Sequence, residues 1–155
     1  MSADRQPPEL RDLVSIPRYL RPEPLPVHPV RGSSPSGEML QHSFGEGWTV
    51  LVFLSTTCEG CTELWAAFSD PTRCAAGTDV ATLVVARATE SREAVAALSA
   101  GSGVVMSDGA WSDYRVEGGP FFVLVDGTDG RVLAEGVAWS VEQIAAAVEV
   151  ARAGG

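Results

Sequence analysis

The stretch TVLVFLSTTCEGCTELWAAF, residues 49–68, decides the fold of this chain. Its first part, residues 49–55, is a continuous apolar run rich in β-branched and aromatic side chains, which predicts a strand covered on both faces. Apolar side chains then recur at helical spacing over residues 61–68. The stretch therefore predicts a central strand that leads directly into a helix, with the motif Cys58-Glu59-Gly60-Cys61 at the junction.

The rest of the chain repeats these two kinds of element. Buried-strand patterns predict strands over residues 81–86, 104–106, 121–125 and 131–134. Alanine-rich stretches predict helices over residues 91–100 and 140–152, the second with Ser140 and Gln143 as a capping box. The turn-rich residues 126–130 predict that the last two strands pair antiparallel. The predicted order is β-α-β-α-β-β-α.

The N-terminal residues differ in composition from the rest. Residues 1–37 hold eight of the ten prolines, and proline fixes φ and removes a backbone donor. We therefore expect a mobile or loosely docked arm over residues 1–37 and one domain over residues 38–155. A chain of 155 residues with 45% hydrophobic content has room for one core of ordinary size.

Charge and hydropathy exclude several classes of function. The chain has 20 acidic and 11 basic residues, a formal net charge of −9, which argues against a nucleic acid partner. No apolar run predicts a membrane span, and the N-terminus lacks the pattern of a signal peptide. We therefore expect a cytoplasmic monomer, or an exported or tethered protein if the sequence is a piece of a longer chain.

The CxxC motif at a predicted strand-to-helix junction points to thiol chemistry. The unpaired amides and the dipole of a first helical turn stabilise a thiolate, and Cys58 is the cysteine that benefits most. Cys61, one turn onward, is placed to attack a mixed disulfide on Cys58. Three cysteines are too few for the disulfide framework of a secreted protein. The motif therefore predicts Cys58 as the nucleophile and Cys61 as the resolving cysteine of a dithiol-disulfide exchange.

Two motifs in this order resemble those of the thioredoxin superfamily. Residues 57–61 lie at a strand-to-helix junction, and residues 118–122 (GGPFF) lie just before a strand. The likeness is greatest to the TlpA/ResA-like thiol-disulfide oxidoreductases, and it covers residues 39–151. The resemblance implies an α/β fold, a thioredoxin-like sandwich with a mixed central sheet flanked by helices on both faces.

The resemblance also implies roles for the residues around the cysteines. In the family, the proline matching Pro120 follows a cis peptide bond and lies against the cysteines, and Gly119 would offer its backbone to an extended substrate strand. Thr57, Glu59 and Gly60 would complete the substrate-binding loop. No cofactor is implied, because electrons pass directly between thiols. The implied partners are proteins with thiols or disulfides and a reductase or oxidant that the sequence does not identify.

The chain departs from the family pattern at four positions. Thr57 stands where the family usually has Trp, and Gly60 stands where it usually has Pro. Val52 replaces the buried acid of thioredoxins, and Glu63 is out of register with the family's helix glutamate. The residue that transfers a proton to Cys61 therefore has no assignment from the sequence.

Other interpretations of the cysteines stay open. The pair could be structural, or it could be half of a zinc site completed by Cys74, His28 or His42. The domain could be a redox-inactive adaptor or a maturation and binding module that keeps the fold without the activity. A peroxidase would need a peroxidatic cysteine near Thr and Arg, and the spacing from Thr72 to Cys74 is one residue short of that pattern.

Residues outside the motif receive structural interpretations. We expect Cys74 to be a partly buried structural cysteine, and His28 and His42 to be surface residues. Trp111 and Trp139 fall near irregular segments, and we expect both to pack against the domain, with lining of the substrate groove as the alternative.

Overall fold

The computed structural model describes residues 15–17, 26–68, 80–99 and 103–154. The strands are β1 (Ser15–Pro17), β2 (Val30–Ser33), β3 (Met39–His42), β4 (Trp48–Phe53), β5 (Ala81–Ala86), β6 (Val104–Met106), β7 (Phe121–Asp126) and β8 (Arg131–Val137). The helices are the 3-10 turn η3 (Glu59–Cys61), α2 (Thr62–Phe68), α3 (Arg92–Ser99), α4 (Asp108–Asp113) and α5 (Val141–Gly154). All of the strands and helices predicted after residue 48 are present.

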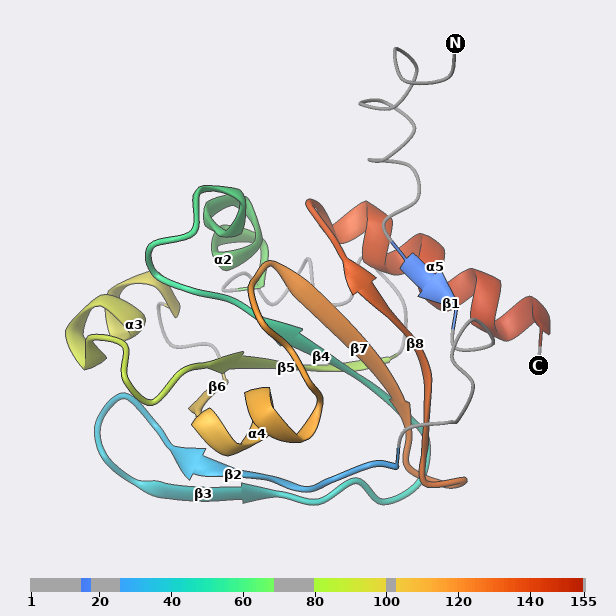
Figure 1. Cartoon of the computed structure of the whole chain (residues 1–155), viewed down its shortest axis with the longest axis horizontal. Coiled ribbons are helices and arrows are strands. Elements are labelled where there is room, and N and C mark those ends of the chain that lie inside the picture. Colours follow the sequence, from blue (N-terminus) through green and yellow to red (C-terminus); the bar gives the residue numbers. More distant parts are fainter. Residues whose placement is uncertain (1–14, 18–25, 69–79, 100–102, 155) are drawn as a thin grey trace, which may run out of the picture.

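The strands form one mixed sheet in the order β1-β8-β7-β4-β5-β6-β2-β3 (Figure 1). β4 pairs in parallel with β5, and β5 with β6, while β7 pairs antiparallel with β4 and with β8. The predicted hairpin of residues 121–134 is therefore confirmed, and so is the central position of the strand that carries the CxxC motif.

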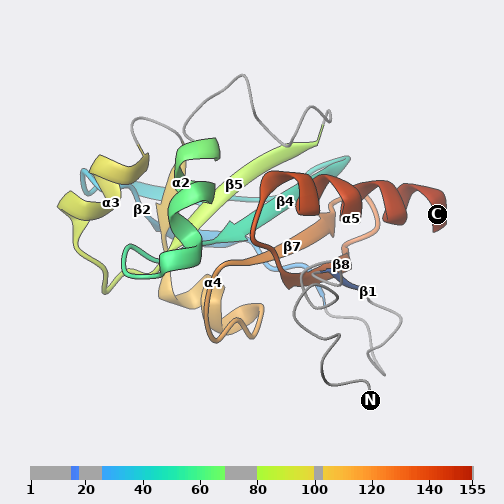
Figure 2. The same ribbon diagram turned by 90° about the horizontal axis from the view of Figure 1, so that it is seen from above.

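Helices cover both faces of the sheet, as Figure 2 shows from the edge. α2, α3 and α5 lie on one face and α4 lies on the other. β4 is buried on both sides: Val50 and Val52 belong to the core under α2 and α5, and Leu51 and Phe53 to the core under α4. A strand between two helical layers has no face open to solvent, which explains the continuous apolar run of β4, as inferred from the sequence. The predicted α/β sandwich with a mixed sheet is confirmed.

The described part of the proline-rich arm contributes strands to the sheet. β1 lies at one edge of the sheet and pairs only with β8. An edge strand accommodates Pro17, which has no amide hydrogen to donate. β2 pairs with β3 and touches β6, so the predicted boundary after Gly37 falls inside the β2–β3 hairpin. The other residues for which we expected a loosely docked arm include residues 1–14 and 18–25, which lie outside the described residues.

A short helix occupies the stretch that the sequence left irregular. α4 begins after Ser107, whose Oγ accepts a hydrogen bond from the Ala110 amide at 3.1 Å. The helix buries Trp111 against Phe53, with ring centroids 5.3 Å apart and nearly perpendicular planes. The prediction that Trp111 is a packing residue is confirmed, and its helix closes the second core.

No helix within the described ranges combines the length and the apolar character that crossing a membrane requires.

Candidate functional site

Four segments from distant parts of the sequence meet where the central strands of the sheet begin or end. Phe53 pairs with Val85 on one side and with Phe121 on the other, and Phe121 pairs with Val137. These four residues form a row across β5, β4, β7 and β8 near the ends of the strands. The CxxC loop follows β4, the β5–α3 loop follows β5, the Gly119–Pro120 segment precedes β7 and the β8–α5 loop follows β8. The row therefore explains why residues so far apart in sequence can share one site.

Cys58 stands at the end of the loop after β4 and at the start of a helical turn. Its backbone is extended, with φ −88° and ψ 121°, and the amide of Cys61 donates to its carbonyl oxygen at 3.1 Å. The chain then runs through η3 directly into α2. Cys58 is half-buried while Cys61 is fully buried, and both are free thiols. The arrangement predicted from the sequence, with one accessible and one interior cysteine, is present.

The thiol of Cys61 is held in its protonated form. Burial is the largest cause, and a hydrogen bond with the Cys58 thiol adds to it, so the pKa of Cys61 is raised from 9.0 to about 12. The amide of Ser55 opposes this effect by donating to Cys61 Sγ at 3.5 Å. At neutral pH the reduced pair therefore has an interior thiol that keeps its proton.

Ser55 connects the loop before Cys58 to the cysteine pair and to α2. Its carbonyl oxygen accepts from Trp65 Nε1 at 3.0 Å, and its Oγ lies 3.1 Å from Thr57 Oγ1 and accepts from the Thr57 amide at 3.2 Å. Together with the contact to Cys61, these bonds fix the turn of chain before the motif. No local sequence pattern marks Ser55, which lies between the end of β4 and the motif.

Glu90, from the loop after the neighbouring strand β5, stabilises the same loop. Its carboxylate accepts hydrogen bonds from the amide of Thr56, at 3.3 Å, and from Thr56 Oγ1. Desolvation raises the pKa of Glu90, but the hydrogen bonds from Thr56 and Ser55 and the charge of Arg87 outweigh it, so the pKa lies below its ordinary value. Glu90 is therefore ionised at neutral pH, and its charge contributes to the raised pKa of Cys61.

The position of Glu90 bears on the acidic residue near Cys61 that the sequence leaves unassigned. Val52 is fully buried in β4, and Glu63 is exposed on α2. The acidic side chain that influences Cys61 comes instead from the β5–α3 loop. One signal could have identified it, because the residues that follow two adjacent parallel strands lie at the same edge of a sheet.

The Gly119–Pro120 segment lies against both cysteines. The peptide bond between Gly119 and Pro120 is cis, and Pro120 is buried. Cys58 Sγ donates a hydrogen bond to the Gly119 carbonyl oxygen at 3.3 Å. A Cβ added to Gly119 would lie 2.7 Å from the Phe53 carbonyl oxygen and 3.5 Å from Cys61 Sγ. Only glycine lets this backbone approach the end of β4 so closely, and this approach brings the segment beside the two thiols.

The loop residues of the motif surround Cys58 at the surface. Thr57 and Glu59 are exposed and Gly60 is half-buried. The indole of Trp139, from the β8–α5 loop, lies over Gly60: a Cβ added there would be 2.6 Å from Trp139 Cε3, closer still to Cζ3, and 3.5 Å from Pro120 Cδ. Trp139 keeps 44% of its surface exposed. The structure therefore places Trp139 at the site, which the packing interpretation of this residue did not predict.

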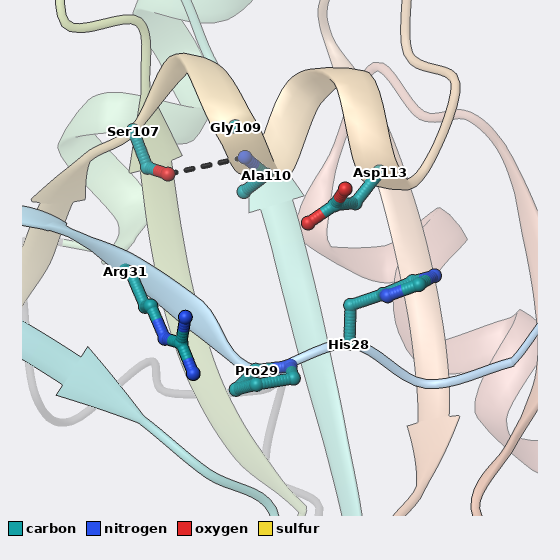
Figure 3. A pocket seen from close by; sticks show the side chains of 7 residues that line it. All are labelled: His28, Pro29, Arg31, Ser107, Gly109, Ala110 and Asp113. Atoms are coloured by element: carbon teal, nitrogen blue, oxygen red, sulfur yellow. Dashed lines mark hydrogen bonds between the residues drawn. The ribbon is translucent and has the colours of Figure 1, made fainter.

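The other candidate ligands lie elsewhere or outside the described residues. His28 lines a separate pocket of about 300 Å³ between the start of β2 and α4, with Arg31 and Asp113 on its walls (Figure 3). His42 is exposed on β3 at the sheet edge, and Cys74 lies outside the described residues. Among the residues that the structure describes, no three His, Cys, Asp or Glu side chains lie close enough together to hold a metal ion.

Solved structures of thiol-disulfide oxidoreductases are similar to this chain. No protein-family model matches the sequence, and a search of curated proteins gave no match. A secreted Mycobacterium tuberculosis disulfide oxidoreductase homologous to E. coli DsbE has a TM-score of 0.60 at 20% identity, covering 77% of this chain and 94% of that one. A DsbF homologue from Corynebacterium diphtheriae has a TM-score of 0.64 at 11% identity, covering 88% and 92%.

A third similar structure extends the pattern. A putative thiol:disulfide interchange protein DsbE from Chlorobium tepidum has a TM-score of 0.64 at 16% identity, covering 83% of this chain and 96% of that one. Each of these chains is matched over nearly its whole length, in agreement with the sheet order and the helical layers described above. The chain therefore has a thioredoxin-like fold.

Proposed function

We propose that this protein is a thiol-disulfide oxidoreductase that exchanges electrons with protein disulfides through Cys58 and Cys61. The observation that carries the proposal is the difference between the two thiols: Cys58 is accessible and bonded to the Gly119 carbonyl, whereas Cys61 is buried with a pKa raised to about 12. An accessible thiol can reach a substrate disulfide, and a buried neighbour can reach only the first thiol.

The exchange proceeds in two balanced steps. The Cys58 thiolate attacks one sulfur of a substrate disulfide, forming a mixed disulfide and releasing the other substrate sulfur as a thiolate that takes a proton. Cys61 then gives up its proton, and its sulfur attacks Cys58 Sγ, which breaks the mixed disulfide and releases the substrate sulfur as a thiolate that takes a proton. The substrate leaves with both sulfurs reduced to thiols, and the enzyme is left with a Cys58–Cys61 disulfide. Two electrons have then passed from the enzyme to the substrate. The reverse sequence oxidises a dithiol substrate.

The site offers an extended substrate a place beside Cys58. Gly119 lies next to the thiol and is half-buried, so a substrate strand that pairs with its backbone would bring a cysteine against Cys58 Sγ. Thr57, Glu59 and Gly60 form the remaining wall. The chemistry requires no organic cofactor or metal, because the reacting groups are thiols. The partner that reduces or oxidises the enzyme would be a second dithiol protein.

The test is the reduction of insulin disulfides by dithiothreitol with the full-length chain as catalyst. We expect the wild-type chain to accelerate the reaction and Cys58→Ser to abolish the acceleration. Cys61→Ser should stop turnover, and when it is mixed with insulin without dithiothreitol it should accumulate a mixed disulfide on Cys58, visible by mass spectrometry. Cys74→Ser is the matched cysteine control and should retain the wild-type rate. An absence of acceleration in the wild-type chain would favour a redox-inactive binding module instead.

A further inference from the structure

An aromatic side chain from the far end of the domain covers the CxxC loop. Trp139 lies in the β8–α5 loop, and its indole occupies the space next to Gly60 that a Cβ at that position would need. The proline ring of Pro120 borders the same space, with Cδ 3.5 Å from that Cβ position. The indole, Gly60 and the buried ring of Pro120 therefore pack together beside Cys58, with the indole outermost.

The backbone on either side of Trp139 is fixed. The Trp139 amide donates to Gln143 Oε1 at 2.6 Å, and the Gln143 amide donates to Ser140 Oγ at 3.2 Å, which is the capping arrangement of α5. The Ala138 amide donates to the Pro120 carbonyl oxygen at 3.4 Å. These bonds hold the backbone that carries the indole, and the indole itself lies against Gly60, so ligand binding removes little further freedom from this side chain.

The indole nevertheless stays open to solvent. Trp139 is 44% exposed, whereas Trp65 and Trp111 are each 2% exposed. Single exposed apolar residues are ordinary, but the backbone of Trp139 is hydrogen-bonded to both neighbouring segments, and its indole packs against the loop that carries Cys58. Rigid aromatic side chains with a free face are the groups that contribute most to binding at protein interfaces.

We propose that Trp139 is a specificity-determining residue that receives an apolar side chain flanking the reacting cysteine of a protein substrate. The inference rests on the proposed function and adds the substrate class: extended segments with a large apolar residue next to the cysteine. Gly60 is the complement of Trp139, because any side chain at position 60 would displace the indole from its present place.

The test compares two peptides that carry a glutathione mixed disulfide on their single cysteine and differ only in the flanking residues. One peptide has Leu on both sides of the cysteine and the other has Ser. The readout is the ratio of the two kcat/KM values, measured with the full-length chain and glutathione as final reductant. A ratio removes any effect of a variant on the thiol chemistry itself.

We expect the wild-type chain to prefer the Leu peptide about tenfold, which corresponds to about 1.4 kcal/mol. Trp139→Ala should bring the ratio close to one, and Trp139→Phe should give an intermediate ratio. Gly60→Ala should lower the ratio although residue 139 is still tryptophan, because the added methyl displaces the indole. Val150→Ser is the matched control, because Val150 is 62% exposed on α5, and it should keep the wild-type ratio.

A wild-type ratio near one would overturn the inference, and so would a Trp139→Ala variant that keeps the preference or that slows both peptides equally. These outcomes leave the proposed function standing, since both peptides are still reduced through Cys58. A wild-type chain that reduces neither peptide would instead contradict the proposed function, and the role of Trp139 with it.

Discussion

The Cys58 thiol donates a hydrogen bond to the carbonyl oxygen of Gly119, with 3.3 Å between sulfur and oxygen, although 61 positions separate the two residues in sequence. This bond joins the loop after β4 to the segment before β7. A substrate strand that pairs with Gly119 would meet the same carbonyl, so the resting thiol occupies a place that the substrate would take.

Gly119→Ala should therefore affect both stability and thiol exchange. The added methyl would lie 2.7 Å from the Phe53 carbonyl oxygen, which belongs to the central strand and has no room to move. We expect a loss of about 1–3 kcal/mol in the free energy of unfolding in urea and a slower exchange rate. Gly118→Ala is the control, because a Cβ there would have no heavy atom within 4 Å. Equal losses in both variants would refute this explanation.

The raised pKa of Cys61 predicts how stability depends on alkaline pH. The reduced unfolded chain releases this proton near pKa 9.0, whereas the folded protein retains it until about 12. The folded state therefore binds more protons in this window, and stability falls as pH rises. Between about pH 8 and about pH 10 the loss should be about 1.4 kcal/mol.

The measurement is urea unfolding of the reduced protein at the two pH values, with Cys61→Ser alongside. The variant lacks the thiol, so its stability should change less over the same interval. Tyr114, whose pKa burial also raises to about 12, contributes equally to both proteins and cancels in the comparison. The same decline in both proteins would show that Cys61 is not its cause.

Glu90→Gln tests the fastening of the loop before the motif. The substitution keeps the size of the side chain but removes the charged acceptor for Thr56. We expect a loss of about 1 kcal/mol in the free energy of unfolding at pH 7, which is below the usual range for charged hydrogen bonds because Glu90 is half-exposed. Since folding lowers the pKa of Glu90, this contribution is present above the ordinary carboxyl pKa and disappears as pH falls through the folded value.

Two further readouts sharpen the Glu90 prediction. Loss of the negative charge should lower the pKa of Cys61, which pH-dependent alkylation of that thiol in the Cys58→Ser background would detect. Glu93→Gln, an exposed glutamate in the first turn of α3, is the charge-matched control and should change stability by less than about 0.5 kcal/mol. Indistinguishable behaviour of the two variants would remove Glu90 from the site.

Arg87→Ala tests the link between the β5–α3 loop and the segment that leads to Pro120. The guanidinium carbon lies 4.1 Å from the centroid of the Trp111 ring, and Nη2 donates to the Glu117 carbonyl oxygen at 3.1 Å. We expect a loss of about 1 kcal/mol in urea unfolding. Arg87→Lys should lose less, because a lysine keeps the charge over the ring. A neutral Arg87→Ala would show that neither contact contributes.

The sequence predicted the elements whose signals are local. The apolar run of residues 49–55, the hairpin turn of residues 126–130 and the cap formed by Ser140 and Gln143 each depend on neighbouring residues, and all three are present. The strands β1, β2 and β3 were missed because each has only three or four residues, and only their non-local partners in the sheet decide their conformation.

The site was predicted in part for the same reason. Cys58 and Cys61 have a motif, whereas Ser55, Glu90 and Trp139 have none and reach the site only because four strand ends meet at one edge. The row of paired residues across the sheet depends on the order of the strands, and no local sequence pattern specifies that order. α4 was missed because it has a single turn and a half, although Ser107 as N-cap was a usable signal.

The most direct test of the central claim is the reduction potential of the Cys58–Cys61 pair, measured by thiol trapping and mass spectrometry in glutathione buffers of graded composition. We predict a reversible two-electron transition, with about 30 mV for each tenfold change in the ratio of disulfide to dithiol, that requires Cys58 and Cys61 and is unchanged by Cys74→Ser. A pair that stays reduced, or stays oxidised, across the whole series, or a transition that persists without Cys61, would contradict the account.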